Sequence, residues 1–161
     1  MKGWIALADT GRPALAGTTL NLLNVGWTNT QAQPGDDGTW ILPEQAVSVF
    51  IEVEWNKVNR QLPFELQLVD EDSVPARIGD PEGGTRELVF KHEVVVAPVP
   101  HAPNGTPGHE ALLVGFATGV ILLPAPNRWY RWIAKLDGRP IAETGFWVEK
   151  APDLPTMGGG A

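Results

Sequence analysis

The stretch from residue 45 to residue 72 constrains the fold more than any other part of the chain, because apolar and polar side chains alternate along it. Successive side chains of an extended strand point to opposite faces, so this period of two predicts β-structure with one face buried. The polar residues 56–60 interrupt the alternation, and the acidic residues 70–72 end it. We therefore expect two half-buried antiparallel strands that lie beside each other, joined by a solvated connection. The apolar side chains that share one face are Val47, Val49, Ile51, Val53, Trp55, Leu62, Phe64, Leu66 and Leu68.

Turn-forming residues divide the rest of the chain into similar short segments. The 161 residues include 18 glycines and 15 prolines, which leaves little room for helices. Asp137 and Gly138 form the strongest hairpin signal, because both residues tolerate the positive φ angles of a primed turn. Residues 29–38 are expected to be a polar loop, and residues 110–118 fit a strand or a helix by periodicity, with a strand favoured by their context. Further strands are expected at residues 3–9, 18–28, 86–96, 128–136 and 139–149.

This spacing of short strands predicts an all-β protein. The best interpretation is an immunoglobulin-like antiparallel β-sandwich of about eight or nine strands with long Pro/Gly-rich loops, and a jelly roll or closed barrel is the alternative. We expect a single sandwich domain over residues 1–150. A flexible Pro/Gly-rich tail is expected at residues 151–161, because its composition cannot bury enough surface to order itself.

Charge and composition exclude several classes of function. The formal net charge of −7 opposes binding to nucleic acid, whose phosphates require clustered lysine and arginine. The chain has 0 cysteines, which excludes disulfides, thiolate catalysis and zinc–thiolate sites. The longest apolar run, residues 111–124, is well short of the ~20 residues that span a bilayer, so we expect no membrane partner. Residues 1–9 contain too short an apolar run for a signal peptide, so we expect cytoplasmic synthesis.

Metal binding has weak candidates only. His101 and His109 lie in a proline-rich loop with Glu110 adjacent, but zinc usually takes closer and more convergent ligands. His92, between charged neighbours, is expected at an edge or on the surface. The acidic residues 70–72 lack the Asp-x-Asp-x-Asp-Gly pattern of a calcium loop and are expected to be a charged, solvated strand end.

Catalytic signatures are also missing from the sequence. Residues 79–84 lack both the lysine and the following helix of a phosphate-binding loop. Ser48 and Ser73 have no Gly-x-Ser-x-Gly context, and spacing suggests no Ser/His/Asp arrangement. We therefore expect no catalytic residue, no cofactor, no metal site and no enzymatic activity.

The order of the strands resembles an uncharacterised family of short immunoglobulin-like proteins found in actinobacteria and their phages. The resemblance spans roughly residues 3 to 150 and implies the immunoglobulin-like fold, without a known active site. The residues that carry it are Trp55, Asn59, Arg60, residues 66–72, Pro124, residues 128–132, Asp137 and Gly138.

Tryptophan is the most informative residue type, with 7 in the chain. Trp55 and Trp132 lie on apolar faces and are expected in the core, whereas Trp4 fits either core or surface. The other tryptophans lie at loop margins or on polar strand faces, where either long loops cover them or they form an exposed interaction site. The residues of this predicted interaction surface are Trp27, Trp40, Phe50, Val69, Trp129, Ile133 and Trp147.

Two classes of function fit these observations. The first is a non-enzymatic structural or interaction module, namely a phage virion-associated protein such as a capsid decoration or head-associated subunit. It implies a protein partner such as a capsid protein, a homo-oligomeric or lattice-bound state, and a final location in the virion. The alternative is a carbohydrate- or other small-ligand-binding β-sandwich module, in which exposed tryptophan rings stack on sugar rings.

Overall fold

The computed structural model describes residues 1–13, 20–79, 83–116 and 121–152. Within these residues the regular secondary structure is almost entirely β-strand, which confirms the predicted all-β class, and the helical segments are two 3-10 turns, η1 (Asp36–Gly38) and η2 (Trp55–Lys57). The helices of the described part are all too short to cross a membrane. Of the predicted tail, only residues 151 and 152 are described. The strands are β1 (Lys2–Ala8), β2 (Thr10–Pro13), β3 (Leu20–Leu23), β4 (Asn29–Pro34), β5 (Trp40–Ile41), β6 (Gln45–Val53), β7 (Gln61–Asp70), β8 (Arg77–Gly79), β9 (Thr85–Glu87), β10 (Val89–Val95), β11 (Gly108–Phe116), β12 (Ile121–Leu123), β13 (Arg128–Leu136) and β14 (Arg139–Lys150).

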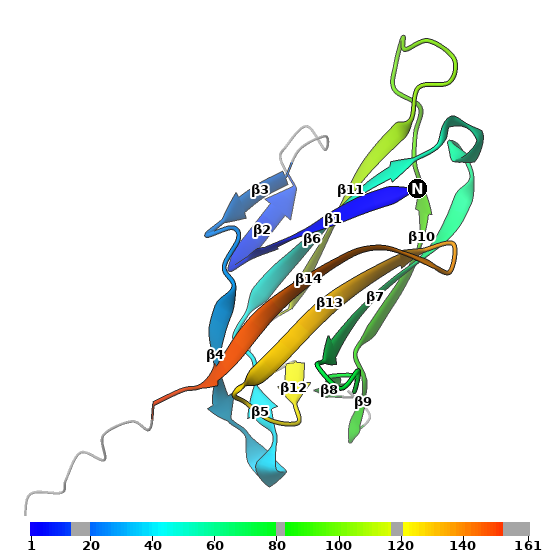
Figure 1. Ribbon diagram of the computed structural model, residues 1–161. Coiled ribbons are helices and arrows are strands. Elements are labelled where there is room, and N and C mark those ends of the chain that lie inside the picture. The colour runs from blue at the N-terminus through cyan, green and yellow to red at the C-terminus, as the bar shows by residue number, and fades with distance from the viewer. Residues whose placement is uncertain (14–19, 80–82, 117–120, 153–161) are drawn as a thin grey trace, which may run out of the picture.

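Two sheets pack face to face (Figure 1). The small sheet has the order β1-β6-β11. The large sheet begins with β10-β7-β13-β14 and continues through β4, β5, β12, β8 and β9, which lie at one end of the molecule (Figure 1). Neighbouring strands are antiparallel except β14 and β4, which are parallel. The β2-β3 hairpin packs on the small sheet, where a Cβ atom on Gly11 would lie only 2.8 Å from Leu113 Cδ1 of β11.

The two alternating strands of residues 45–72 do not lie beside each other, and the prediction of a hairpin there is wrong. β6 pairs with β1 and β11, whereas β7 pairs with β10 and β13. The connection contains η2 and a left-handed Asn59 (φ 58°), and it carries the chain from one sheet to the other. The crossing lets the apolar faces of β6 and β7 meet across one core, which a two-stranded hairpin could not close by itself.

The core lies between the sheets and is filled by the predicted alternating side chains. Trp132 of β13 is fully buried and stacks on Phe116 of β11, with ring centroids 5.2 Å apart. Its indole Nε1 donates to Gln45 Oε1 of β6 at 3.1 Å. The Trp132 side chain therefore connects the two sheets by packing and by a buried hydrogen bond. The largest fully buried side chains are Trp132, Tyr130, Phe64, Phe146, Leu42, Ile51, Leu66, Leu68, Leu88, Ile121, Leu123 and Leu136.

The predicted C-terminal hairpin is confirmed. β13 and β14 pair up to Leu136 opposite Arg139, and the two residues between them, Asp137 and Gly138, have φ angles of 53° and 71°. Both positive angles match the primed turn that these residue types favour. The ambiguous segment at 110–118 is strand β11 as far as residue 116, where its description ends.

Two further expectations are wrong. Residues 29–34, predicted to be loop, form β4, because their backbone groups pair with the last residues of β14. Trp55, predicted to be in the core, is 42% exposed because the alternation ends at Val53 and Trp55 belongs to η2 in the crossing connection.

Candidate functional site

The residues predicted to form one interaction surface lie in separate parts of the structure. Trp129, Ile133 and Trp147 share the outer face of the large sheet, where Trp129 pairs with Trp147 across β13 and β14. Phe50 lies on the outer face of the small sheet, since its neighbours in β6, Val49 and Ile51, are buried in the core. The two faces are on opposite sides of the sandwich, so these residues cannot contact one partner surface together.

The other three residues of that prediction are shielded to different degrees. Trp27 and Trp40 are partly buried and pack against the core. Val69 is buried, and its predicted position on the surface is wrong. The chain turns back after β7, so that Val69 forms a β-bridge with Pro75 on one side. On its other side Val69 pairs with Arg131 of β13.

The outer face of the large sheet is a solvated, charged surface. Trp129 is 47% exposed and meets Trp147 edge-on, with ring centroids 5.9 Å apart. Around these rings the face carries ion pairs, of which the shortest joins Lys135 Nζ to Glu65 Oε1 at 2.8 Å. Such a mixture of paired charges is typical of a sheet face in water. The remaining ion pairs on this face are Arg131–Glu143 and Lys91–Glu65.

The outer face of the small sheet has the more exposed tryptophan. Trp4 of β1 is 58% exposed and stacks flat on Phe50 of β6, with ring centroids 3.6 Å apart and an interplanar angle of 8°. The two residues are direct cross-strand partners, and Ala111 is the partner of Phe50 on the other side. Cross-strand neighbours have Cβ atoms close enough for such ring contact. The stack therefore holds the exposed Trp4 ring in a defined orientation.

A hollow of about 870 Å³ adjoins this aromatic pair. It is lined by apolar side chains of the small sheet and by the proline-rich segment that precedes β11, among them Trp4, Leu20, Phe50, Pro98, Pro100 and Ala111. Lys2 and Glu52 form a 4.0 Å ion pair at its border. We call this surface the Trp4 face. It combines an exposed, oriented aromatic ring with an adjacent apolar depression, the combination that is common in protein-binding sites.

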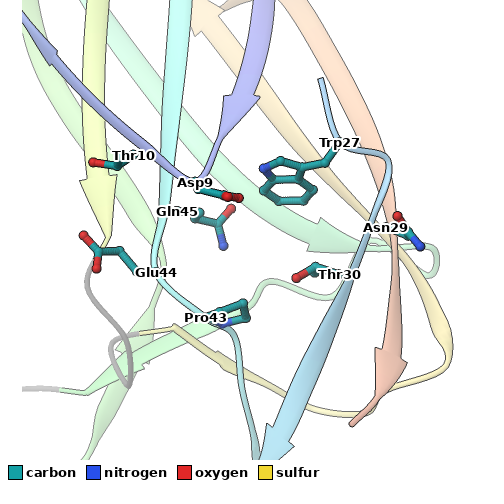
Figure 2. A pocket seen from close by; sticks show the side chains of 8 residues that line it. All are labelled: Asp9, Thr10, Trp27, Asn29, Thr30, Pro43, Glu44 and Gln45. Atoms are coloured by element: carbon teal, nitrogen blue, oxygen red, sulfur yellow. The ribbon is translucent and has the colours of Figure 1, made fainter. Parts of the chain in front are cut away.

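A second candidate is a cleft of about 690 Å³ between the end of β1, the segment that leads into β4, and the start of β6. Figure 2 shows Asp9, Gln45, Trp27 and Thr30 around its centre, whereas Asn29 points away. Pro43 and Glu44 belong to the lining from the segment before β6, and the Glu44 side chain points away from Gln45 and Trp27 (Figure 2).

Two of the residues that line this cleft, Trp27 and Gln45, carry buried hydrogen-bond donors. Gln45 is only 2% exposed, and the Trp132 indole, which can only donate, fixes Gln45 Oε1 toward the core. Gln45 Nε2 therefore points elsewhere, and like Trp27 Nε1 it has no hydrogen-bond partner among the described residues. A buried donor without a partner costs about 1–3 kcal/mol, so these two atoms lower the stability of this part of the fold.

The histidines and acidic residues considered as metal ligands from the sequence do not form a metal-binding cluster in the described residues. Within the described ranges, no group of three or more His, Cys, Asp or Glu lies close enough to hold a metal ion. His101 is exposed with a φ of 60° in the loop before β11, and His109 is exposed beside the Trp4 face. Ser48 is buried in β6 and Ser73 is exposed in the turn after β7.

Sequence reasoning missed two residues of these sites. For Trp4 the sequence fitted a position either in the core or on the surface. Its exposed ring is held by stacking on Phe50, a partner that no local pattern identifies. Gln45 begins the alternating stretch and has no signal of its own, because its burial depends on Trp132 across the sandwich.

The strand pairing defines the class of protein. Seven strands make the two facing layers, and in chain order the first, second and fifth (β1, β6, β11) form one layer while the third, fourth, sixth and seventh (β7, β10, β13, β14) form the other. Tyr130, at the start of β13, donates its hydroxyl to Ala125 O at 2.6 Å, five residues upstream. This contact matches the tyrosine corner of immunoglobulin-like domains. The protein is an immunoglobulin-like antiparallel β-sandwich, as predicted.

Comparison with known proteins adds two solved structures. An immunoglobulin-like protein from Pseudomonas aeruginosa is 17% identical over 80% of this chain and 82% of that chain, with a TM-score of 0.37. A β-glucuronidase of glycoside hydrolase family 2 is 12% identical over 67% of this chain but 10% of that chain, with a TM-score of 0.30. No protein-family model and no curated protein matches. The class therefore rests on the strand pairing, and the resemblance to actinobacterial and phage proteins gains no support from these comparisons.

Proposed function

We propose that this chain is a non-enzymatic interaction module that docks onto a partner protein through the Trp4 face. The observation that carries the proposal is the Trp4 ring, 58% exposed and held flat against Phe50 beside an apolar hollow. A tryptophan that is already oriented loses little side-chain freedom on binding, and large aromatic side chains contribute much of the energy at interfaces.

The chemistry of the Trp4 face indicates the kind of partner. The hollow takes an apolar side chain, and the Lys2–Glu52 pair at its border offers both signs of charge to a polar rim. The formal net charge of −7 makes two copies of the chain repel each other, which favours a partner of different sequence and lower negative charge.

The finer proposal is that the partner belongs to a phage particle, with this chain as a capsid decoration or head-associated subunit. Its support is the sequence resemblance to immunoglobulin-like proteins of actinobacteria and their phages. Copies would then occupy equivalent positions on the lattice.

Co-sedimentation tests both levels of the proposal. Native particles from cells that produce the chain would first be searched for it by mass spectrometry. Purified wild-type chain, Trp4→Ala and Trp129→Ala would then be added back to those particles. We expect Trp4→Ala to weaken binding by about ten-fold or more, since Trp4 would be a hot-spot residue. Trp129→Ala, a similarly exposed tryptophan on the opposite sheet, should bind as the wild type does.

Two results would contradict the proposal. If both variants bind as tightly as the wild type, the Trp4 face is not the docking surface. If the chain is recovered only as a free monomer and in no larger assembly, the docking function itself is wrong. Thermal unfolding of the two variants shows whether either result comes from a damaged fold.

A further inference from the structure

Strand β10 forms an open edge of the large sheet. It lies at one end of the strand order, and among the described strands it pairs only with β7. A strand with one unpaired side presents a row of backbone N–H and C=O groups to which a further strand can bind. This edge is separate from the Trp4 face, which lies on the outer side of the other sheet.

Hydrogen bonds near β7 show which backbone groups of β10 are directed to the open edge. The carbonyl of Val96, one residue after β10, accepts from Asn59 N at 3.0 Å on the β7 side. Backbone groups of an antiparallel strand alternate in direction, so the even-numbered residues of β10 face β7 and the odd-numbered residues face outward. Pro63 agrees with this pattern, because it has no N–H and lies opposite the odd-numbered Glu93.

The sequence of β10 is complementary to itself. Its order Val-Phe-Lys-His-Glu-Val-Val is nearly symmetric about His92, with apolar residues at both ends and opposite charges beside the centre. In an antiparallel pair of two copies centred on His92, Lys91 of each copy lies opposite Glu93 of the other. Val89 then lies opposite Val95. These are the odd-numbered residues, so one register matches both the outward backbone groups and the charges.

Two opposing effects are weaker than this match. Charged residues on an edge strand commonly block pairing, but here opposite charges meet, and both Lys91 and Glu93 are exposed. The net charge of −7 repels a second copy. That repulsion is spread over the whole domain and is screened beyond about 8 Å at physiological salt, whereas hydrogen bonds between adjacent strands act at contact distance.

We propose that two copies of this chain associate through β10 as an antiparallel dimer with its two-fold axis at His92. The two large sheets then form one continuous sheet. Both copies use the same strand, so the contact is complete with two copies. The Trp4 face of each copy stays open, and the dimer therefore does not depend on docking through that face.

Sedimentation velocity of the full chain at physiological salt, from micromolar to millimolar concentration, measures the association. We expect a monomer–dimer equilibrium. Amide hydrogen exchange followed by nuclear magnetic resonance locates the contact. Exchange of the Lys91 and Glu93 amides should slow as the concentration rises, whereas exchange of the His92 amide, which is directed toward β7, should change little.

Charge-swap variants test the register. Lys91→Glu places like charges opposite each other twice across the contact, and so does Glu93→Lys, so we expect each to weaken association by about ten-fold or more. A mixture of the two variants should associate, because opposite charges then meet at both positions. The double variant Lys91→Glu/Glu93→Lys should associate as the wild type does. It also lacks the 3.8 Å contact between Lys91 and Glu65, so it controls for the loss of that contact.

Arg131→Glu is the matched control, since it changes the net charge as Lys91→Glu does but lies on β13, away from the edge. It should leave association unchanged. Three outcomes would overturn the proposal: a monomer at every concentration, equal weakening by Lys91→Glu and Arg131→Glu, or wild-type association of both single variants. Thermal unfolding shows whether each variant is folded. Particle binding is tested separately by Trp4→Ala, so the two proposals can fail independently.

Discussion

Arg128 Nη1 lies 2.6 Å from Asp70 Oδ2, and the Asp70 side chain in this ion pair is fully buried. Asp70 Oδ1 also accepts the backbone N–H groups of Asp72 at 3.0 Å and Val74 at 2.8 Å. One carboxylate thus closes the turn after β7 and joins it to the start of β13. The expectation of a solvated acidic strand end is wrong for Asp70, whereas Glu71 and Asp72 are exposed.

Replacing Asp70 with alanine should lower the free energy of unfolding by about 3 kcal/mol, because it leaves two backbone donors and the Arg128 guanidinium without their acceptor. Asp72→Ala is the matched control, since Asp72 is exposed and lies 3.6 Å from the same Arg128 atom. We expect the control to change the unfolding free energy by less than about 0.5 kcal/mol. Urea denaturation measures both. Equal effects of the two substitutions would contradict the structural role given to Asp70.

Tyr130 should titrate far above the ordinary range of a tyrosine. Burial raises its pKa from 10.0 to about 12. The folded state therefore favours the neutral phenol more than the unfolded state does. The stability that follows is fully present below pH 10.0 and is lost as the pH rises toward 12.

Tyrosinate absorbance reports this transition directly, because the chain has 1 tyrosine. We expect half-ionisation near pH 12 while the protein remains folded. Tyr130→Phe should be about 1–2 kcal/mol less stable at neutral pH, and its stability deficit should shrink above pH 10.0, since it has no phenol to ionise. A transition at the ordinary pKa with the fold intact would refute the burial of this hydroxyl.

Ser48→Ala should stabilise the protein by about 1 kcal/mol. The Ser48 hydroxyl is fully buried in β6 and has no hydrogen-bond partner among the described residues. Its removal eliminates an unpaired polar atom without changing the packing volume much. Thermal unfolding of the variant measures the effect. A loss of stability would mean that the hydroxyl has a partner in the folded protein.

Trp132 and Trp55 should respond very differently to substitution by phenylalanine. Trp132→Phe leaves a cavity and an unpaired Gln45 Oε1 in the core, so we expect a loss of about 3 kcal/mol. Trp55 is exposed in the connection between the sheets, and Trp55→Phe should cost less than about 1 kcal/mol. Urea denaturation of the pair checks the corrected position of Trp55. Similar losses of unfolding free energy in the two variants would indicate that Trp55 lies in the core.

The C-terminal hairpin shows what local patterns predict well. The bounds of β13 match the predicted segment, and the turn at Asp137 and Gly138 has the expected positive φ angles. Strand alternation and turn chemistry are local properties, so both can be read from neighbouring residues. The candidate sites are not local. Trp4 lies on Phe50, and Gln45 lies on Trp132, so neither site could be predicted from spacing along the chain.

The stretch at residues 45–72 shows separately what local alternation and what long-range contacts contribute to the fold. Alternation by itself determined that β6 and β7 are strands and which of their side chains enter the core. It did not determine their partners, because an apolar strand face is buried equally well by a neighbour in the same sheet or by an opposite sheet. Only the tertiary structure placed β6 and β7 in different sheets, buried Val69 and Asp70, and brought Trp4 onto Phe50. Those outcomes depend on contacts between segments distant in the chain, which one core must satisfy together.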